Sequence, residues 1–174
     1  AHYRRRSHGG QQYITTGVYP PNATDATAAS LDTAGALILD FDHPNKEQLR
    51  DLEDDALAAT LAAFWVEIEA TLPAPPTRVS CSGYGFHVYY WLDYPVDGFP
   101  DLAVTQRANR RLVAGVPLAD QGVHDAGTRI LRPLGTSNTK NQTRPRPVEL
   151  VVSTPHRYTL EELAPMSSAV EAIA

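Results

Sequence analysis

The chain has 174 residues, a formal net charge of −5 at pH 7 and 43% hydrophobic residues, which is typical of one globular domain with a sizeable core. No apolar run approaches the roughly 20 residues of a membrane-spanning helix, so we expect no membrane partner. A single cysteine, Cys81, excludes an internal disulfide and a cysteine-based structural zinc site, and it fits the reducing cytoplasm. We interpret residues 1–174 as one domain, and the start at Ala1 rather than Met favours an origin in a longer protein.

The charges are unevenly distributed along the chain. Residues 1–100 contain 13 acidic and 6 basic side chains, whereas residues 101–157 contain 4 acidic and 9 basic ones. The negative total argues against a generic nucleic-acid binder. An acidic half facing a basic half would suit a site that joins metal ions to a polyanion.

The first half of the chain has both strand and helix patterns. Residues 1–12 predict a loose lead-in, and "YITTGVY" (13–19) has strand composition. Within "GALILDFDHP" we expect a short buried strand over 36–42. Apolar residues spaced mostly three and four apart predict one long helix over 45–72, which "PAPP" ends.

A glycine hairpin is predicted next. "SCSGYGFHVYYWL" (80–92) has the composition of two antiparallel strands joined by a tight turn, with His87 near the start of the second strand and Ser82 beside it. The remaining predicted elements are a helix over 101–114, a strand within "TRILRPLG" (128–135), a strand over 148–152 and a capped helix over 159–163. Because strands and helices mix without a strict βαβ rhythm, the predicted class is α+β.

Paired acids follow the first buried strand. Asp40 and Asp42 are alternate residues, so their carboxylates would project from one face of the strand end. A divalent cation would relieve the repulsion between them. The alternative is a strand end with two solvated acids.

The hairpin "SGYGFH" carries a second candidate site. Its glycines would let backbone N–H groups approach a phosphate, and His87 could donate a hydrogen bond to phosphate oxygens. The alternative is an ordinary glycine hairpin with a satisfied core histidine.

The segment "ADQGVHDAGTRILRPLGTSNTK" (119–140) supplies a third acid and a basic run. Asp120 and Asp125 compete for the role of the acid, and either could simply be solvated. The cations and the amide near the Gly-Thr turn suit triphosphate oxygens, although a basic exposed strand is the alternative. These residues are Arg129, Arg132, Asn138 and Lys140.

The three stretches together resemble the archaeo-eukaryotic primase (AEP) superfamily, which includes primase-polymerases of plasmids, phages and mobile elements. "LILDFD" is similar to its first motif, "SGYGFH" to its second motif S-G-x-G-x-H, and residues 119–140 to its third, a hydrophobic-Asp followed by R-x-x-R-x-P-G-[ST]-x-[NH]-x-K. The order of Pro133 and Leu134 departs from the usual L-P-G, which leaves the path of the turn before Gly135 open.

The resemblance implies a fold and an activity. The fold would be a primase-polymerase core over about 36–152, with an RNA-recognition-like mixed or antiparallel sheet flanked by helices. The activity would be template-directed transfer of nucleotides from (d)NTPs to a 3′-hydroxyl on DNA, with two Mg²⁺ or Mn²⁺ ions. Because the family's acid stands nine residues before the first Arg, Asp120 rather than Asp125 takes the metal role with Asp40 and Asp42. The resemblance assigns the triphosphate to Ser82, His87, Arg129, Arg132, Asn138 and Lys140.

Other arginines are candidates for the DNA backbone, namely Arg107, Arg110, Arg111, Arg144 and Arg146. A helicase, fused or associated, is a further expected partner. Two competing functions remain open. One is a non-catalytic RNA-recognition-like nucleic-acid-binding module, and the other is a D-x-D phosphohydrolase, whose later Lys and acidic-pair motifs we do not find.

Overall fold

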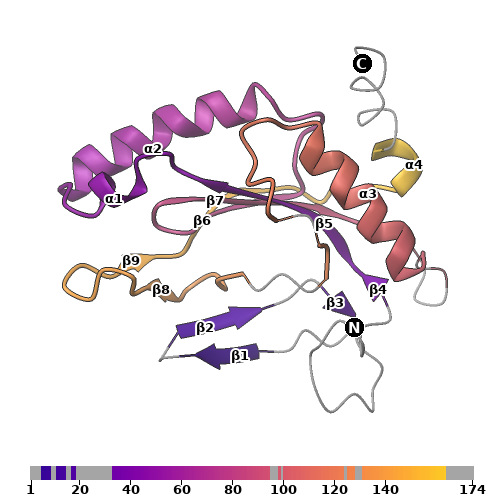
Figure 1. The fold of residues 1–174 in the computed structure, drawn as a ribbon, viewed down its shortest axis with the longest axis horizontal. Helices are drawn as coiled ribbons and strands as arrows, with labels where there is room; N and C mark the ends of the chain where they lie inside the picture. Colours follow the sequence, from indigo (N-terminus) through magenta and orange to yellow (C-terminus); the bar gives the residue numbers. More distant parts are fainter. Residues whose placement is uncertain are drawn as a thin grey trace.

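The computed structural model describes residues 5–8, 11–14, 17–18, 33–94, 98, 100–123, 125–127 and 131–163. Its centre is a four-stranded antiparallel sheet with the strand order β10-β6-β7-β5 (Figure 1). The sheet strands are β5 (Ala36–Asp42), β6 (Arg78–Cys81), β7 (Gly85–Trp91) and β10 (Glu149–Ser153). The α+β prediction is confirmed.

Two main helices cover one face of this sheet, and short two-stranded ribbons lie on its other side (Figure 1). The helices are α1 (Lys46–Leu49), α2 (Asp54–Glu69), α3 (Leu102–Ala114) and α4 (Leu160–Leu163). The ribbons pair β1 (Arg5–His8) with β2 (Gln11–Ile14), β3 (Gly17–Val18) with β4 (Thr33–Ala34), and β8 (Ser137–Asn138) with β9 (Arg146–Pro147).

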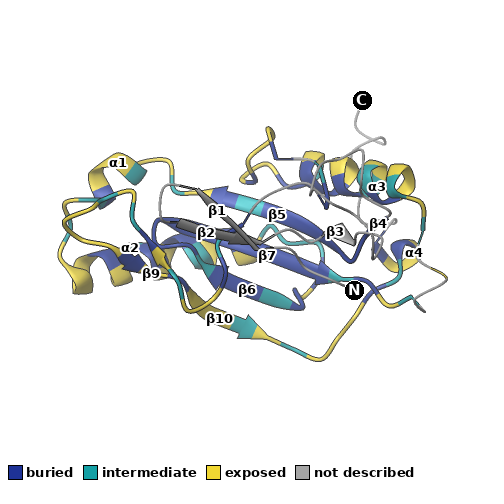
Figure 2. Ribbon diagram, turned by 90° about the horizontal axis from the view of Figure 1, so that it is seen from below, coloured by how far each residue is buried: buried dark blue, intermediate teal, exposed yellow. Residues whose placement is uncertain are grey.

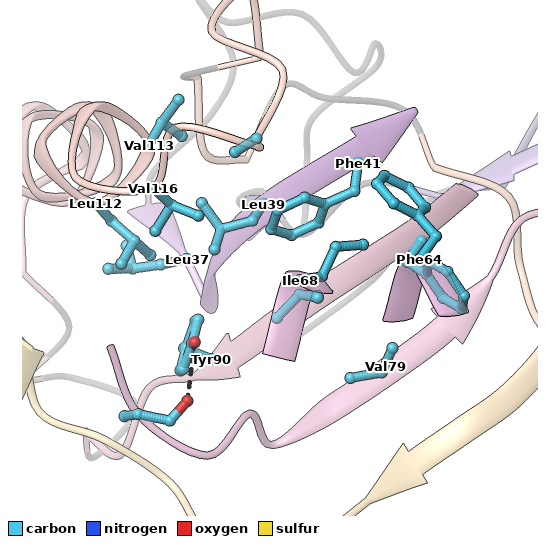
Figure 3. Packing of buried hydrophobic residues seen from close by; sticks show 14 of the residues in the cluster. Leu37, Leu39, Phe41, Phe64, Ile68, Val79, Tyr90, Leu112, Val113 and Val116 are labelled. Atoms are coloured by element: carbon cyan, nitrogen blue, oxygen red, sulfur yellow. Dashed lines mark hydrogen bonds between the residues drawn. The ribbon is translucent and has the colours of Figure 1, made fainter. Parts of the chain in front are cut away.

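The core lies between the sheet and the helices (Figure 3). Alternate residues of β5, Leu37, Leu39 and Phe41, are buried on this face. In α2 the buried residues follow the four-three-four spacing of one helical face. They are Leu57, Leu61, Phe64 and Ile68. The alternate residues of the sheet strands therefore point to the opposite face of the sheet. The candidate site lies on that face, away from the core.

The single helix predicted over 45–72 is wrong, because the chain breaks into α1 and α2. The break frees backbone carbonyls that a continuous helix would use internally. The Leu52 carbonyl accepts from Arg146 Nη2 at 2.8 Å and from Arg144 Nη1 at 3.3 Å, and the Arg50 carbonyl accepts from Asn141. These partners come from some 90 residues later in the chain, so local periodicity could not reveal the break.

Other predictions had mixed outcomes. The predicted loose lead-in is wrong, since β1 and β2 form a hairpin within it. No strand occurs in the described part of 128–135, where Leu134 and Gly135 form a turn with a left-handed Gly135, φ +76°. Strands and helices at 36–42, 101–114, 148–152 and 159–163 are confirmed within one residue at each end, and the hairpin predicted over 80–92 is confirmed as the pair of β6 and β7. The capping box is also confirmed, because Thr159 N donates to Glu162 and Glu162 N to Thr159.

None of the helices in the described part of the chain is long and apolar enough to cross a membrane.

We expect Arg146→Met to lower the free energy of unfolding by about 1.5–3 kcal/mol, because it removes buried charge-assisted hydrogen bonds. Arg146 is only 7% exposed, pairs with Asp54 and donates to the Leu52 carbonyl. The matched control is Arg144→Met, whose exposed pair with Glu53 should contribute less than about 1 kcal/mol. Urea denaturation of both variants measures this, and equal losses would contradict the role given to Arg146.

Candidate active site

Three polar residues form a row across three neighbouring strands. His87 in β7 lies directly opposite Asp40 in β5 and opposite Ser80 in β6. Directly opposed residues in antiparallel strands share a face, so these three side chains lie together on the face away from the core. His87 Nε2 lies 3.8 Å from Asp40 Oδ1, and both side chains are largely buried. The predicted placement of Asp40 and Asp42 on one face is confirmed, and His87 shares that face.

The serine that lies opposite His87 is Ser80, and the prediction that Ser82 sits beside it is wrong. Ser82 belongs to the turn, where its N–H donates to the Gly85 carbonyl at 2.8 Å. Ser80 is 2% exposed and adjoins Tyr89. Burial raises the pKa of Tyr89 well above its usual range, and the Ser80 hydroxyl opposes this to a smaller extent. Strand parity counted back from the turn would have found Ser80.

Both glycines of the hairpin are explained by packing within the protein. A Cβ at Gly85 would lie 2.0 Å from the Phe41 carbonyl oxygen. Gly83 has φ +97°, and a Cβ there would lie 2.8 Å from Arg146 Cβ and 3.3 Å from Asn138 Cβ. Gly85 thus permits the close approach of β5 and β7, and Gly83 permits the approach of the β8–β9 ribbon.

Asp120 lies next to Asp40 through a backbone contact. Its N–H donates to the Asp40 carbonyl at 2.8 Å, and its exposed side chain accepts from Gly122 N at 2.8 Å. Gln121 fastens this loop to the end of α3, because its Nε2 donates to the carbonyls of Val113, Val116 and Ala119. Asp125 instead pairs with Arg110 at 3.1 Å. Of the two competing acids, Asp120 is the one beside Asp40.

Lys46 supplies positive charge at the carboxylates, and the sequence analysis missed it. Its Nζ lies 2.5 Å from Asp42 Oδ2. The hydrogen bond that Lys46 donates to Asp42 is the main cause of the raised pKa of Lys46, and the negative charges of Asp42, Glu47 and Asp120 add to it. Lys46 therefore lies within the field of two of the three predicted metal ligands. Asp42 ends β5 and Lys46 begins α1, so the helical rule for residues four apart could not have revealed this pair.

The acidic residues suit a hard divalent cation in the type of donor that they supply. Carboxylate oxygens are the ligands that Mg²⁺ and Mn²⁺ prefer. Within the described ranges, however, no three His, Cys, Asp or Glu side chains are gathered closely enough to hold a metal ion. Asp42 is engaged by Lys46 and Asp120 by Gly122 N. A bound metal would thus require Lys46 to give up Asp42.

The predicted triphosphate ligands differ in their surroundings. Arg129 lies outside the described residues, and Arg132 is half-buried. Asn138 is buried, donates to the Ser82 carbonyl at 2.7 Å and accepts from Lys140 N at 3.1 Å. It therefore fastens the β8–β9 ribbon to the hairpin turn. Lys140 is exposed.

The predicted DNA-contacting arginines do not form one surface. Arg107, Arg110 and Arg111 are exposed on α3, on the helix side of the sheet. Arg146 is buried against Asp54 and Leu52, so its proposed contact with the DNA backbone is wrong on grounds of access. Arg144 pairs with Glu53 at 2.7 Å and keeps 43% of its side chain exposed.

A cavity of about 870 Å³ lies on the helix side of the sheet, between α2 and β10. Its lining includes Leu57, Trp65, Cys81 and Val151. Burial raises the pKa of the Cys81 thiol, which is typical of a packing residue and not of a reactive cysteine. The lining contains none of Asp40, Asp42, His87 and Asp120, so this cavity is separate from the candidate site.

Comparison with known proteins identifies the fold. No protein-family model and no curated protein matches this sequence. The AEP domain of the cyanophage S-2L primase-polymerase is 18% identical, with a TM-score of 0.61 over 90% of this chain and 69% of that one. The chain has the fold of an AEP primase-polymerase domain. The primase RepB′ is 15% identical, with a TM-score of 0.50 over 94% of this chain and 45% of that one.

In this chain Asp40 and Asp42 lie on β5, whose outer edge is covered by α3 and the loop after it. Asn109 is fully buried in α3, and its Oδ1 accepts from Ile38 N at 2.7 Å. The next outward-facing residue of β5 is Asp40, which receives the Asp120 N–H. Asn109 is therefore a positioning residue that sequence analysis missed. The only signal for it in the sequence was a single polar residue within a predicted helix.

We expect Asn109→Ala to destabilise the fold by about 1–3 kcal/mol, because the buried Ile38 N–H would lose its acceptor. Amide exchange at Ile38 should accelerate with it. Gln106→Ala, on the same helix and half-buried, is the control and should change neither quantity appreciably. Unchanged exchange at Ile38 in Asn109→Ala would contradict this account of the β5 edge.

Proposed function

We propose that this chain is the catalytic part of a DNA primase-polymerase, transferring nucleotides from (d)NTPs to a 3′-hydroxyl on a DNA template. The observation that carries the proposal is the position of Asp120 beside the Asp40–His87–Ser80 row. This backbone contact sets the loop that carries the third predicted acid against β5, on a fold shared with a phage primase-polymerase domain. Replication of DNA is the corresponding process, with DNA and nucleotides as partners.

The carboxylates of Asp40, Asp42 and Asp120 would hold two Mg²⁺ or Mn²⁺ ions. When bound, such ions lower the pKa of an attacking hydroxyl and stabilise charge developing at the α-phosphate. His87, buried beside Asp40, would donate a hydrogen bond to a phosphate oxygen and would be oriented by that carboxylate. Arg132 and the exposed Lys140 would neutralise the triphosphate, together with Arg129.

A second candidate function is nucleic-acid binding without catalysis. The aromatic rings of Tyr89 and Trp91 are stacked on the sheet face of the site, with centroids 6.1 Å apart and planes 8° apart. RNA-binding sheets stack bases on exposed aromatic rings, whereas Tyr89 is buried here. Both rings here belong to β7, and the same face carries the acids, so we favour catalysis. Metal-dependent incorporation of labelled nucleotide separates the two functions.

Asp40→Asn and Asp120→Asn should each lower nucleotide incorporation more than about a hundredfold, since loss of even an outer partner of a metal site costs 10–100-fold. Both variants should stay folded, because neither carboxylate lies in the hydrophobic core. Asp125→Asn is the control, since its carboxylate pairs with Arg110 away from Asp40. The measurement is primer extension with circular dichroism as the check of folding. Activity lost in Asp125→Asn and kept in Asp120→Asn would reverse the assignment.

Lys46→Met should raise the affinity for Mn²⁺ roughly two- to fivefold, because Lys46 competes for Asp42 with the strength of a partly exposed ion pair. Calorimetric titration with Mn²⁺ in the absence of nucleotide measures the change directly. Arg50→Met is the matched control, since it removes a nearby cation that pairs with Glu47 instead. A lower Mn²⁺ affinity in Lys46→Met would show that Lys46 supports the metal site rather than competing with it.

A further inference from the structure

A second polar pocket lies on the same sheet face, further along β6 and β7. Its volume is about 300 Å³, and Arg78, Trp91, Ser153 and Arg157 are among its lining residues. Arg78 is two residues from Ser80 in β6, and Trp91 is four residues from His87 in β7, so both share the face of the candidate site. At about 3.3 Å per residue, the pocket begins about 7 Å from the Ser80–His87 row and reaches about 13 Å from it.

The pocket is positively charged and no acid lines it. Within the described ranges, neither Arg78 nor Arg157 forms an ion pair. The Nε of Arg78 is buried and has no hydrogen-bond partner there. A buried donor without an acceptor is costly, and a ligand oxygen would remove that cost. The planar fork of an arginine fits phosphate oxygens in particular.

Trp91 adds a flat apolar surface beside the two arginines. It is half-buried, and its ring is stacked against Tyr89 in the adjoining row. Its backbone N–H donates to Thr77 Oγ1 at 3.1 Å, which fixes the end of β7 against the start of β6. A rigid aromatic ring in a pocket that two arginines also line offers stacking for a base and hydrogen bonds for a phosphate.

We propose that this pocket binds one nucleoside phosphate unit, with its phosphate on Arg78 and Arg157 and its base against Trp91. The ligand is either a nucleotide within a DNA strand or a free nucleotide, since both present the same chemistry. The inference deepens the proposed function, because the pocket would hold a second nucleotide next to the one handled at Asp40 and His87. The sequence analysis assigned none of these residues.

Trp91 itself can report binding. The chain has two tryptophans, so Trp65→Phe leaves Trp91 as the only one. In EDTA, which removes divalent ions, a short oligodeoxynucleotide and a dNTP are titrated separately into this variant. We expect quenching of Trp91 by the oligodeoxynucleotide, the dNTP or both, and at least tenfold weaker binding when Arg78→Gln or Arg157→Gln is added. Quenching by the oligodeoxynucleotide alone identifies the strand as the source.

Arg50→Gln is the matched control, because it removes a cation that pairs with Glu47 near α1. The fluorescence anisotropy of a labelled oligodeoxynucleotide measures its affinity for the natural chain and for Arg78→Gln. This repeats the test without the Trp65 substitution. Unchanged affinity in Arg78→Gln, or inorganic phosphate competing as well as the nucleotide does, would overturn the proposal. Asp40→Asn should bind the oligodeoxynucleotide and the dNTP as before, because Asp40 does not line the pocket. Loss of incorporation with intact quenching would therefore test the proposed function and not this proposal.

Discussion

Among the strands that the structure describes, β5 pairs only with β7, and the candidate site depends on how the backbone groups of its outer edge are satisfied. An edge strand would otherwise present unpaired N–H and carbonyl groups. Here Asn109 accepts from the Ile38 N–H, and the Asp120 N–H donates to the Asp40 carbonyl. These contacts lie two residues apart on one strand, so they set both α3 and the following loop against β5. The third acid reaches the first through backbone pairing, not through attraction between like-charged side chains.

The charge balance at the acids depends on a distant part of the chain. Arg146 and Arg144 donate hydrogen bonds to the Leu52 carbonyl, which lies in the turn that separates α1 from α2. The turn leaves α1 as a single short helix that begins at Lys46, next to Asp42. Two arginines that looked like DNA contacts thus help to place a lysine among the acids. These two arginines therefore act on the candidate site indirectly, by stabilising the turn before α2.

Sequence reasoning succeeded where the signal was local. The hydrophobic run before Asp40 predicted β5, and the alternation of its acids predicted their common face. The capping box at Thr159 is a three-residue signal and was also recovered. The helix break and the burial of Arg146 depend on partners about 90 residues away, which no local pattern encodes. The sequence analysis placed Ser82 beside His87, whereas Ser80 lies there, because motif spacing says nothing about where a strand ends and its turn begins.

Register explains why the hairpin needs its second glycine. In β7 the residues Phe86, Val88 and Tyr90 pack in the core, while His87 faces the acids. A slip of one residue would exchange the two sets and bury the histidine in the core. Gly85 pairs with Asp42, where any Cβ would lie 2.0 Å from the Phe41 carbonyl. Only glycine can occupy that position. A slipped pairing would put another residue opposite Asp42, and its side chain would clash with the backbone of β5. The glycine that suggested phosphate binding therefore acts by holding His87 opposite Asp40.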